Sequence, residues 1–161
     1  MDTFRIRKIS AEDDAPASSI IKKVLTEYGL NREGFAFVDA ELEALSKHYI
    51  APRALYFVAE VNGVIVGGAG FGPLLGEDAK TAELKKMYLV KEGRGLGIGA
   101  GLMREILTHA AGGGYARIYL ETMPEMTDAI RLYEKSGFQA ISEPMGNTGH
   151  HGCQAFFVKT L

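Results

Sequence analysis

The sequence lacks the features that would place the chain outside the ordinary globular proteins. Its 161 residues include no tryptophan and one cysteine, Cys153. A single cysteine excludes an intramolecular disulfide and fits a reducing compartment. No apolar run is long enough to span a bilayer, and the first seven residues, Met-Asp-Thr-Phe-Arg-Ile-Arg, lack the apolar core of a signal peptide. We therefore expect one domain, residues 1–161, that acts in the cytoplasm without a membrane.

An excess of charge of either sign is also missing. Lysine and arginine together number 18 and aspartate and glutamate 20, which gives a formal net charge of −2. Because no basic face is evident, neither nucleic acid nor an anionic membrane is an expected partner. Hydrophobic residues make up 47% of the chain, enough for a core that needs no disulfide or metal.

Glycine is abundant in one stretch, Glu92 to Gly101, where five of the ten residues are glycine. The stretch follows an extended-looking run at 82–90 and precedes a run at 102–110 whose apolar residues have helical spacing. Glycine lets backbone N–H groups approach a ligand closely. The start of a helix adds unpaired N–H donors and the positive end of its dipole. The stretch therefore predicts an anion site, with phosphate as the expected ligand.

Two general phosphate-binding patterns can be compared with this stretch. A Walker loop requires Gly-Lys-Ser/Thr at its end, and no lysine follows these glycines. The dinucleotide fingerprint G-x-G-x-x-G/A is met by Gly95, Gly97 and Ala100, with Glu121 at the end of the next expected strand. The loop alone therefore leaves an NAD(P)-dependent oxidoreductase open as an alternative.

Periodicity and turn residues divide the chain into strands and helices. Asn62-Gly63 separates two of the strands and predicts a tight hairpin turn. The expected strands lie at 4–9, 55–61, 64–71, 82–90, 115–122, 138–142 and 154–159. The expected helices lie at 16–28, 39–49, 102–110 and 128–135. A dinucleotide-binding fold would need repeated strand–helix–strand crossovers from its first strand, and this order offers only one clear crossover.

Two motifs in this order resemble those of the GNAT acetyltransferases. Arg94, Gly97 and Gly99 meet the pattern Q/R-x-x-G-x-G/A of the family's acetyl-CoA pyrophosphate loop. The run from residue 129 to residue 138, Ala-Ile-Arg-Leu-Tyr-Glu-Lys-Ser-Gly-Phe, is similar to A-x-x-L-Y-x-K-x-G-F, in which a short helix brings a tyrosine to the CoA sulfur. One position departs from the family, because Met126 stands where many members carry an asparagine that contacts the cofactor.

The resemblance covers most of the chain and implies a mixed α+β fold. Its central, mostly antiparallel sheet would have seven strands, with about four helices around it, and would splay between the fourth and fifth strands. The pantetheine arm of acetyl-CoA would lie in that wedge. The implied cofactor-binding residues are Met87, Leu89, Arg94, Gly95, Leu96, Gly97, Ile98, Gly99, Ala100 and Tyr133.

The resemblance also implies an activity, the direct transfer of an acetyl group from acetyl-CoA to a primary amine of a small molecule or a peptide N-terminus. The acceptor would meet residues 31–37 and 143–152, the two regions that form acceptor pockets in the family. Many relatives are dimers, so a homodimer is an expectation by analogy alone. A non-catalytic acyl-CoA-binding domain of the same fold remains an alternative.

Acetyl transfer to an amine needs a base, a donor for the developing oxyanion, and a proton for the leaving thiolate. Glu83 lies eleven residues before Arg94, the separation at which family members with a glutamate base carry it. By the same analogy the backbone N–H of Met87 is the oxyanion donor and Tyr133 the proton donor. Glu121 is a rival base, and a water molecule could act between base and amine.

Structural roles remain open beside these catalytic ones. Glu83 could be a strand glutamate paired with Lys85, and Tyr133 a core tyrosine with a satisfied hydroxyl. His150, His151 and Cys153 could suggest a metal site, but no second cluster completes a set of four ligands. We therefore expect no metal, a loop over the acceptor pocket at 143–152, and a buried thiol.

Overall fold

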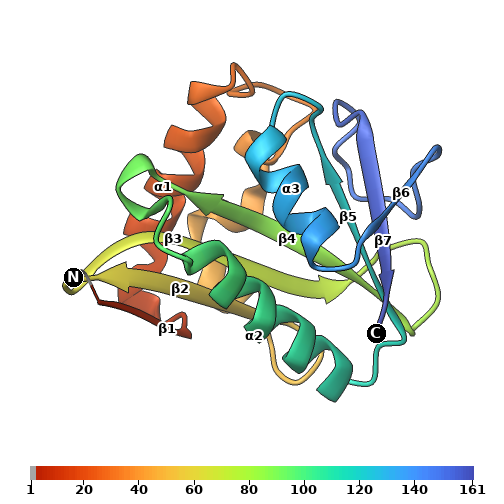
Figure 1. Cartoon of the computed structure of the whole chain (residues 1–161), viewed down its shortest axis with the longest axis horizontal. Helices are drawn as coiled ribbons and strands as arrows, with labels where there is room; N and C mark the ends of the chain where they lie inside the picture. Colours follow the sequence, from red (N-terminus) through yellow and green to blue (C-terminus); the bar gives the residue numbers. More distant parts are fainter. Residues whose placement is uncertain (1–2) are drawn as a thin grey trace.

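In the described part of the chain seven strands form one sheet, in the spatial order β1-β2-β3-β4-β5-β7-β6 (Figure 1). The computed structural model describes residues 3–161, so the first two residues of the expected domain lie outside the described part. The strands are β1 (Phe4–Lys8), β2 (Leu55–Val61), β3 (Val64–Pro73), β4 (Thr81–Leu89), β5 (Arg117–Thr122), β6 (Gln139–Ile141) and β7 (Ala155–Thr160). Among these described strands only β4 and β5 pair in parallel, whereas all other neighbours in the sheet are antiparallel. The predicted mostly antiparallel, seven-stranded sheet is confirmed.

The hairpin between β2 and β3 turns at the dipeptide that predicted it. Asn62 has φ of 50° and Gly63 has φ of +80°, so both central residues are left-handed. That combination matches the twist of a tight two-residue hairpin, which asparagine and glycine adopt at little cost. The turn fixes the register of the hairpin, with Val61 opposite Val64.

Within residues 3–161, three α-helices accompany the sheet: α1 (Asp14–Glu27), α2 (Ile98–Gly112) and α3 (Thr127–Lys135). The helix predicted at 39–49 is wrong. Two short 3-10 turns lie there instead, at Ala40–Glu43 and Leu45–Lys47, and a third, Ala36–Val38, precedes them in the described chain. Leu42 and Leu45 are buried three residues apart, a spacing that serves a 3-10 turn as well as an α-helix. Ala44, with φ of −158° and ψ of 69°, separates the turns. Over residues 3–161, no helix has the length and apolar character that crossing a membrane requires.

Both faces of the sheet are covered. In Figure 1, α2 lies in front of the sheet and α1 behind it. Successive side chains of β2 point to opposite faces. Phe57 accordingly packs in one core cluster with Leu102 and Ile106 of α2, and Val58 packs in another with Ile21 of α1. The two cores hold the sheet rigidly between its helices.

β4 and β5 run side by side only at their beginnings. Residues 81–83 pair with residues 117–119, and beyond Glu83 the strand β4 continues to Leu89 with no partner in β5. Figure 1 shows the two strands diverging from this point. The predicted splay between the fourth and fifth strands is confirmed, and it leaves a wedge in the middle of the sheet.

β4 is also irregular where the wedge begins. Gly70 of β3 pairs with Lys85 and Gly68 pairs with Tyr88, so two residues of β4 stand opposite one residue of β3. This arrangement is a β-bulge. Lys86 within it has φ of 52°, a left-handed conformation that is uncommon for a lysine. The bulge takes Lys86 and Met87 out of the regular ladder.

Candidate active site

The loop between β4 and α2 presents a row of free backbone donors. Gly95 and Gly97 have φ of +76° and +84°, which glycine adopts without the penalty that a Cβ would bring. Gly97 caps the N-terminus of α2. None of the N–H groups from Gly95 to Ala100 donates a hydrogen bond to another described residue of the chain. Free N–H groups at the positive end of a helix dipole form a site for an anion.

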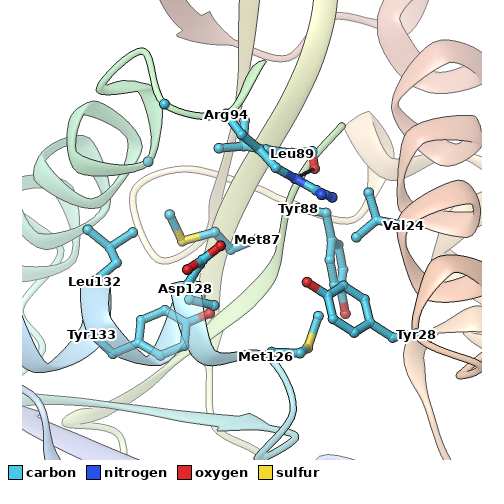
Figure 2. Close-up of a pocket in the computed structure, with 13 residues that line it drawn as sticks. Val24, Tyr28, Met87, Tyr88, Leu89, Arg94, Met126, Asp128, Leu132 and Tyr133 are labelled. Atoms are coloured by element: carbon cyan, nitrogen blue, oxygen red, sulfur yellow. Dashed lines mark hydrogen bonds between the residues drawn. The ribbon is translucent and has the colours of Figure 1, made fainter. Parts of the chain in front are cut away.

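A cavity of about 410 Å³ opens beside this loop. Figure 2 shows Val24 of α1 and Tyr28, which directly follows α1, reaching toward it, and Leu132 and Tyr133 of α3 on the opposite side. Its volume lies within the range of ligand-binding pockets, roughly 300–1,000 Å³. The divergence of β4 from β5 therefore produces an elongated apolar cleft that ends at a set of free donors.

Most of the proposed cofactor residues lie at this cavity. Those that line it are Met87, Leu89, Arg94, Gly95, Gly99 and Tyr133. Leu96, Gly97, Ile98 and Ala100 do not line it. The Ile98 side chain is buried in the core, so only its backbone faces the loop. The predicted loop thus lies beside the cavity, and its residues divide between those that line the cavity and those that do not.

Sequence reasoning missed several lining residues, among them Val24, Tyr28, Tyr88 and Asp128. Val24 and Tyr28 lie one helical turn apart, a signal that could have found them but that also fits ordinary core packing. Met126 lines the cavity with its thioether, where the family's asparagine would offer an amide. The departure noted in the sequence therefore lies at the site itself.

Arg94 connects the glycine loop to α1 across the mouth of the cleft. Its Nε donates a hydrogen bond to the carbonyl oxygen of Leu89 at 2.9 Å, which fixes the stem of the side chain. Its Nη2 lies 3.1 Å from Oε2 of Glu27. Because both partners of this ion pair are partly exposed, the pair is weak and can be exchanged for another anion.

Glu83 is a buried carboxylate without a protein partner. It is 7% exposed and lines a small cavity of about 50 Å³ together with Phe35 and His150. Among residues 3–161 no hydrogen bond or ion pair of its carboxylate is found, and Lys85, the partner considered from the sequence, lies 3.4 Å from Glu41 instead. Burial raises the pKa of Glu83 from 4.5 to about 7, against the opposing effect of nearby lysines.

Tyr133 projects from α3 into the wedge. Its ring packs edge-on against Phe138 and is tilted against Phe157, with centroid distances of 6.0 and 6.2 Å. Its hydroxyl makes no hydrogen bond to another described residue, and it lines the cleft. Burial raises the pKa of Tyr133 above its ordinary value, so the hydroxyl keeps its proton at neutral pH.

This fold and its motifs match known proteins. The model of the Acetyltransferase (GNAT) family matches residues 21–138, which is more than half of the chain.

The chain belongs to the GNAT acetyltransferase family. It is therefore an acyltransferase. The Escherichia coli (strain K12) protein named Uncharacterized N-acetyltransferase YjgM is 35% identical over 157 residues, which are 97% of this chain and 94% of that protein.

Two solved structures share the fold at low sequence identity. A GNAT family acetyltransferase of Staphylococcus aureus Mu50 has a TM-score of 0.80 at 20% identity and covers 98% of this chain and 99% of its own. The acetyltransferase YncA of Salmonella typhimurium, solved with its cofactor acetyl-CoA, has a TM-score of 0.73 at 20% identity and covers 98% and 93%. The alternative of a dinucleotide-binding fold is wrong, because the sheet has a single parallel pair of strands.

Both carboxylate oxygens of Glu121, the alternative base considered from the sequence, accept hydrogen bonds. The hydroxyl of Tyr119 donates a hydrogen bond to its Oε2 at 2.6 Å. The hydroxyl of Thr148 donates to its other oxygen. Glu121 thus ties the 143–152 loop to β5, and this arrangement favours a structural role over that of a base.

His150 and His151 lie in this 143–152 loop, and Cys153 directly follows it. Nε2 of His150 lies 2.8 Å from Oδ2 of Asp39, so the 143–152 loop meets the 3-10 segment beside Glu83. His151 packs next to Gly34. Within residues 3–161, no three His, Cys, Asp or Glu side chains are grouped closely enough to hold a metal ion. Burial raises the pKa of Cys153 to about 12, which keeps it a thiol.

The buried state of Glu83 makes a prediction about stability. Its carboxyl group has a higher pKa in the folded chain, about 7, than the ordinary 4.5, so ionisation opposes folding as the pH rises between these values. The cost reaches about 3 kcal/mol above pH 7. We expect Glu83→Gln to be more stable than the wild type toward urea at pH 8.5, with the difference shrinking at pH 5.

Glu43→Gln is the matched control, since Glu43 is exposed. Its effect should be small and the same at both pH values. A Glu83→Gln variant that is less stable than the wild type at pH 8.5 would contradict the assignment of an unpartnered, buried carboxylate.

Proposed function

We propose that this protein is an N-acetyltransferase that moves the acetyl group of acetyl-CoA directly to a primary amine. The acceptor is a small molecule or a peptide N-terminus. One observation carries the proposal: the free N–H groups from Gly95 to Ala100 stand at the end of the cleft between the diverging strands. We expect the enzyme to act in the cytoplasm, where its single cysteine would stay reduced.

The residues at the cleft fit acetyl-CoA. The free N–H groups of the glycine loop would bind the diphosphate, and Arg94 would exchange Glu27 for a phosphate oxygen. The apolar walls formed by Met87, Leu89 and Leu132 suit the pantetheine arm. Strand β4 has no partner in β5 beyond residue 83, so its edge faces the wedge where the amides of that arm would lie.

The chemistry divides among three groups of the chain. The neutral amine attacks the thioester carbonyl, so that a C–N bond forms and the C–S bond breaks. Glu83 accepts the proton that the amine releases, directly or through water, and a pKa of about 7 suits this task at neutral pH. The N–H of Met87 stabilises the charge on the carbonyl oxygen.

Tyr133 would act on the leaving sulfur. Its hydroxyl is protonated at neutral pH and lacks another partner in the described chain, so it is available to donate a hydrogen bond to the thiolate. A hydrogen bond to a charged atom contributes about 1.5–3 kcal/mol. The hydroxyl faces the cleft, where bound acetyl-CoA would displace the water that otherwise competes for it.

The acceptor would approach from the side of Glu83 away from the large cleft. The small cavity at Glu83 is covered by Phe35 and by the contact between His150 and Asp39. Phe35 and His150 belong to the two segments, 31–37 and 143–152, that the family resemblance assigned to the acceptor. At about 50 Å³ the cavity admits little more than an amine head group, so the two segments must move apart for a larger acceptor.

An amine-panel assay that measures release of free CoA tests this proposal. We expect transfer to at least one primary amine, with kcat/KM rising between pH 5.5 and pH 8 as Glu83 ionises. Glu83→Gln should lower kcat by at least about 100-fold and flatten the pH profile. Tyr133→Phe should lower kcat by about 10-fold or more, as expected for loss of a hydrogen bond to a charged atom.

The control is Glu43→Gln, which should transfer at the wild-type rate. If neither Glu83→Gln nor Tyr133→Phe changes the rate of an observed transfer, the assigned roles are wrong. A wild-type protein that binds acetyl-CoA but acetylates no amine in the panel would support the non-catalytic domain instead.

The ion pair between Arg94 and Glu27 makes a second prediction. Replacing Glu27 with glutamine frees Arg94 and removes a negative charge near the expected diphosphate. We expect Glu27→Gln to bind CoA about two- to five-fold more tightly by calorimetry, as befits a partly exposed pair. Glu12→Gln, another exposed carboxylate, should bind as the wild type does. Weaker binding by Glu27→Gln would contradict the placement of the diphosphate.

A further inference from the structure

The side chain of Tyr56 reaches from β2 across the neighbouring strand β3 to β4. It belongs to β2, is 2% exposed, and its hydroxyl donates a hydrogen bond to the carbonyl oxygen of Lys86 in β4 at 2.9 Å. Two glycines of the intervening strand make room for the ring. A Cβ at Gly68 or at Gly70 would lie 2.6 Å from a ring carbon of Tyr56. Any side chain at either position would push the ring away from β4.

The residue that Tyr56 holds is the strained one in the β-bulge. Lys86 has φ of 52°, a conformation that costs about 1–3 kcal/mol for a residue other than glycine and persists only when its surroundings enforce it. Its side chain is 2% exposed, and its Nζ lies 2.8 Å from Asp39 and 2.5 Å from Glu41. Tyr49 in turn donates to Glu41 at 2.8 Å. The bulge is therefore fixed through both the side chain and the carbonyl group of Lys86.

The carbonyl of Lys86 and the N–H of Met87 belong to the same peptide group. A trans peptide is planar, and its C=O and N–H point in opposite directions. A hydrogen bond that fixes the direction of the Lys86 carbonyl therefore also fixes the direction of the Met87 N–H, away from Tyr56. That N–H is the donor to which the proposed function assigns the thioester oxygen.

We propose that Tyr56 is a positioning residue for acetyl transfer, whose hydroxyl orients the Met87 N–H through the shared peptide group. The role rests on the proposed function. It does not require Tyr56 to touch a substrate, since Tyr56 is absent from the lining of the cleft. Without the hydroxyl, the peptide group loses its anchor, and the N–H spends less time aimed at the carbonyl oxygen.

Tyr115 offers a matched control for this role. It is 4% exposed, and its hydroxyl donates to the carbonyl oxygen of Arg53 at 2.7 Å. It does not line the cleft. Tyr56→Phe and Tyr115→Phe thus each remove one hydrogen bond from a tyrosine hydroxyl to a backbone carbonyl, buried for Tyr56 and partly buried for Tyr115, while the ring still fills its volume. A purely structural role predicts that the two variants behave alike.

The kinetic test compares the two variants with an amine that the wild type acetylates. We expect Tyr56→Phe to lower kcat by about 10-fold or more, because it misdirects an oxyanion donor, with KM for acetyl-CoA unchanged within about two-fold. Tyr115→Phe should keep the wild-type kcat, with a comparable shift of the urea midpoint. Equal kcat values for Tyr56→Phe and the wild type would overturn the role of Tyr56 and leave the proposed function intact.

A spectroscopic test needs no acceptor. Acetyl-CoA labelled with ¹³C at the thioester carbonyl is bound to each protein, and the carbonyl stretch is measured by difference infrared spectroscopy. A hydrogen bond from Met87 lowers this frequency in the wild type and in Tyr115→Phe, and we expect a smaller shift in Tyr56→Phe. The same shift in all three proteins would overturn the positioning role. A wild type that binds no acetyl-CoA would overturn the proposed function and, with it, the role of Tyr56.

Discussion

The site depends on one constraint in the sheet, the loss of pairing between β4 and β5 after Glu83. Two parallel strands that share only a short stretch of ladder must separate, and the space between them cannot be closed by the sheet itself. The glycine loop follows the C-terminal end of β4, and α3 follows the C-terminal end of β5. Both elements are thereby brought to the same wedge. The free N–H groups of the glycine loop and Tyr133 meet there although 36 residues separate Gly97 from Tyr133 in the chain.

Burial and hydrogen bonding distinguish the two carboxylates at the wedge. Both Glu83 and Glu121 stand near its start, and simple proximity would make either a base. Two hydroxyl donors satisfy Glu121, whereas Glu83 is buried and has no described hydrogen-bond partner, although Lys85, Lys86 and His150 line the same small cavity. Desolvation therefore dominates at Glu83 and brings its pKa to about 7. The loop that Glu121 anchors also brings His150 to Asp39. The hydrogen bonds of Glu121 therefore help to cover the cavity at Glu83.

Sequence patterns predicted those parts of the fold that local chemistry determines. Asn62-Gly63 predicted the hairpin turn, and the alternating glycines after an extended run predicted the loop that leads into α2. The two family motifs marked Arg94 and Tyr133 at the cleft. The splay was predicted from the family resemblance and not from periodicity, because no local pattern shows where two strands stop pairing.

The remainder depended on contacts between distant residues. Nothing in the segment 39–49 excluded an α-helix, and the 3-10 turns there carry the carboxylates that bind Lys86 of β4. A left-handed lysine has no sequence signature. Glu121 differs from Glu83 in part because it accepts a hydrogen bond from Thr148, which lies 27 residues away in the chain. The bond from Tyr56 to Lys86 spans 30 residues and needs the two glycines of β3 between them.

A crystal structure with acetyl-CoA bound tests the central claim most directly, because it locates both ends of the ligand at once. The account predicts diphosphate oxygens within hydrogen-bonding distance of the N–H groups between Gly95 and Ala100, and the thioester in the wedge between Met87 and Tyr133. A diphosphate bound away from this loop, or a thioester outside the wedge, would contradict it.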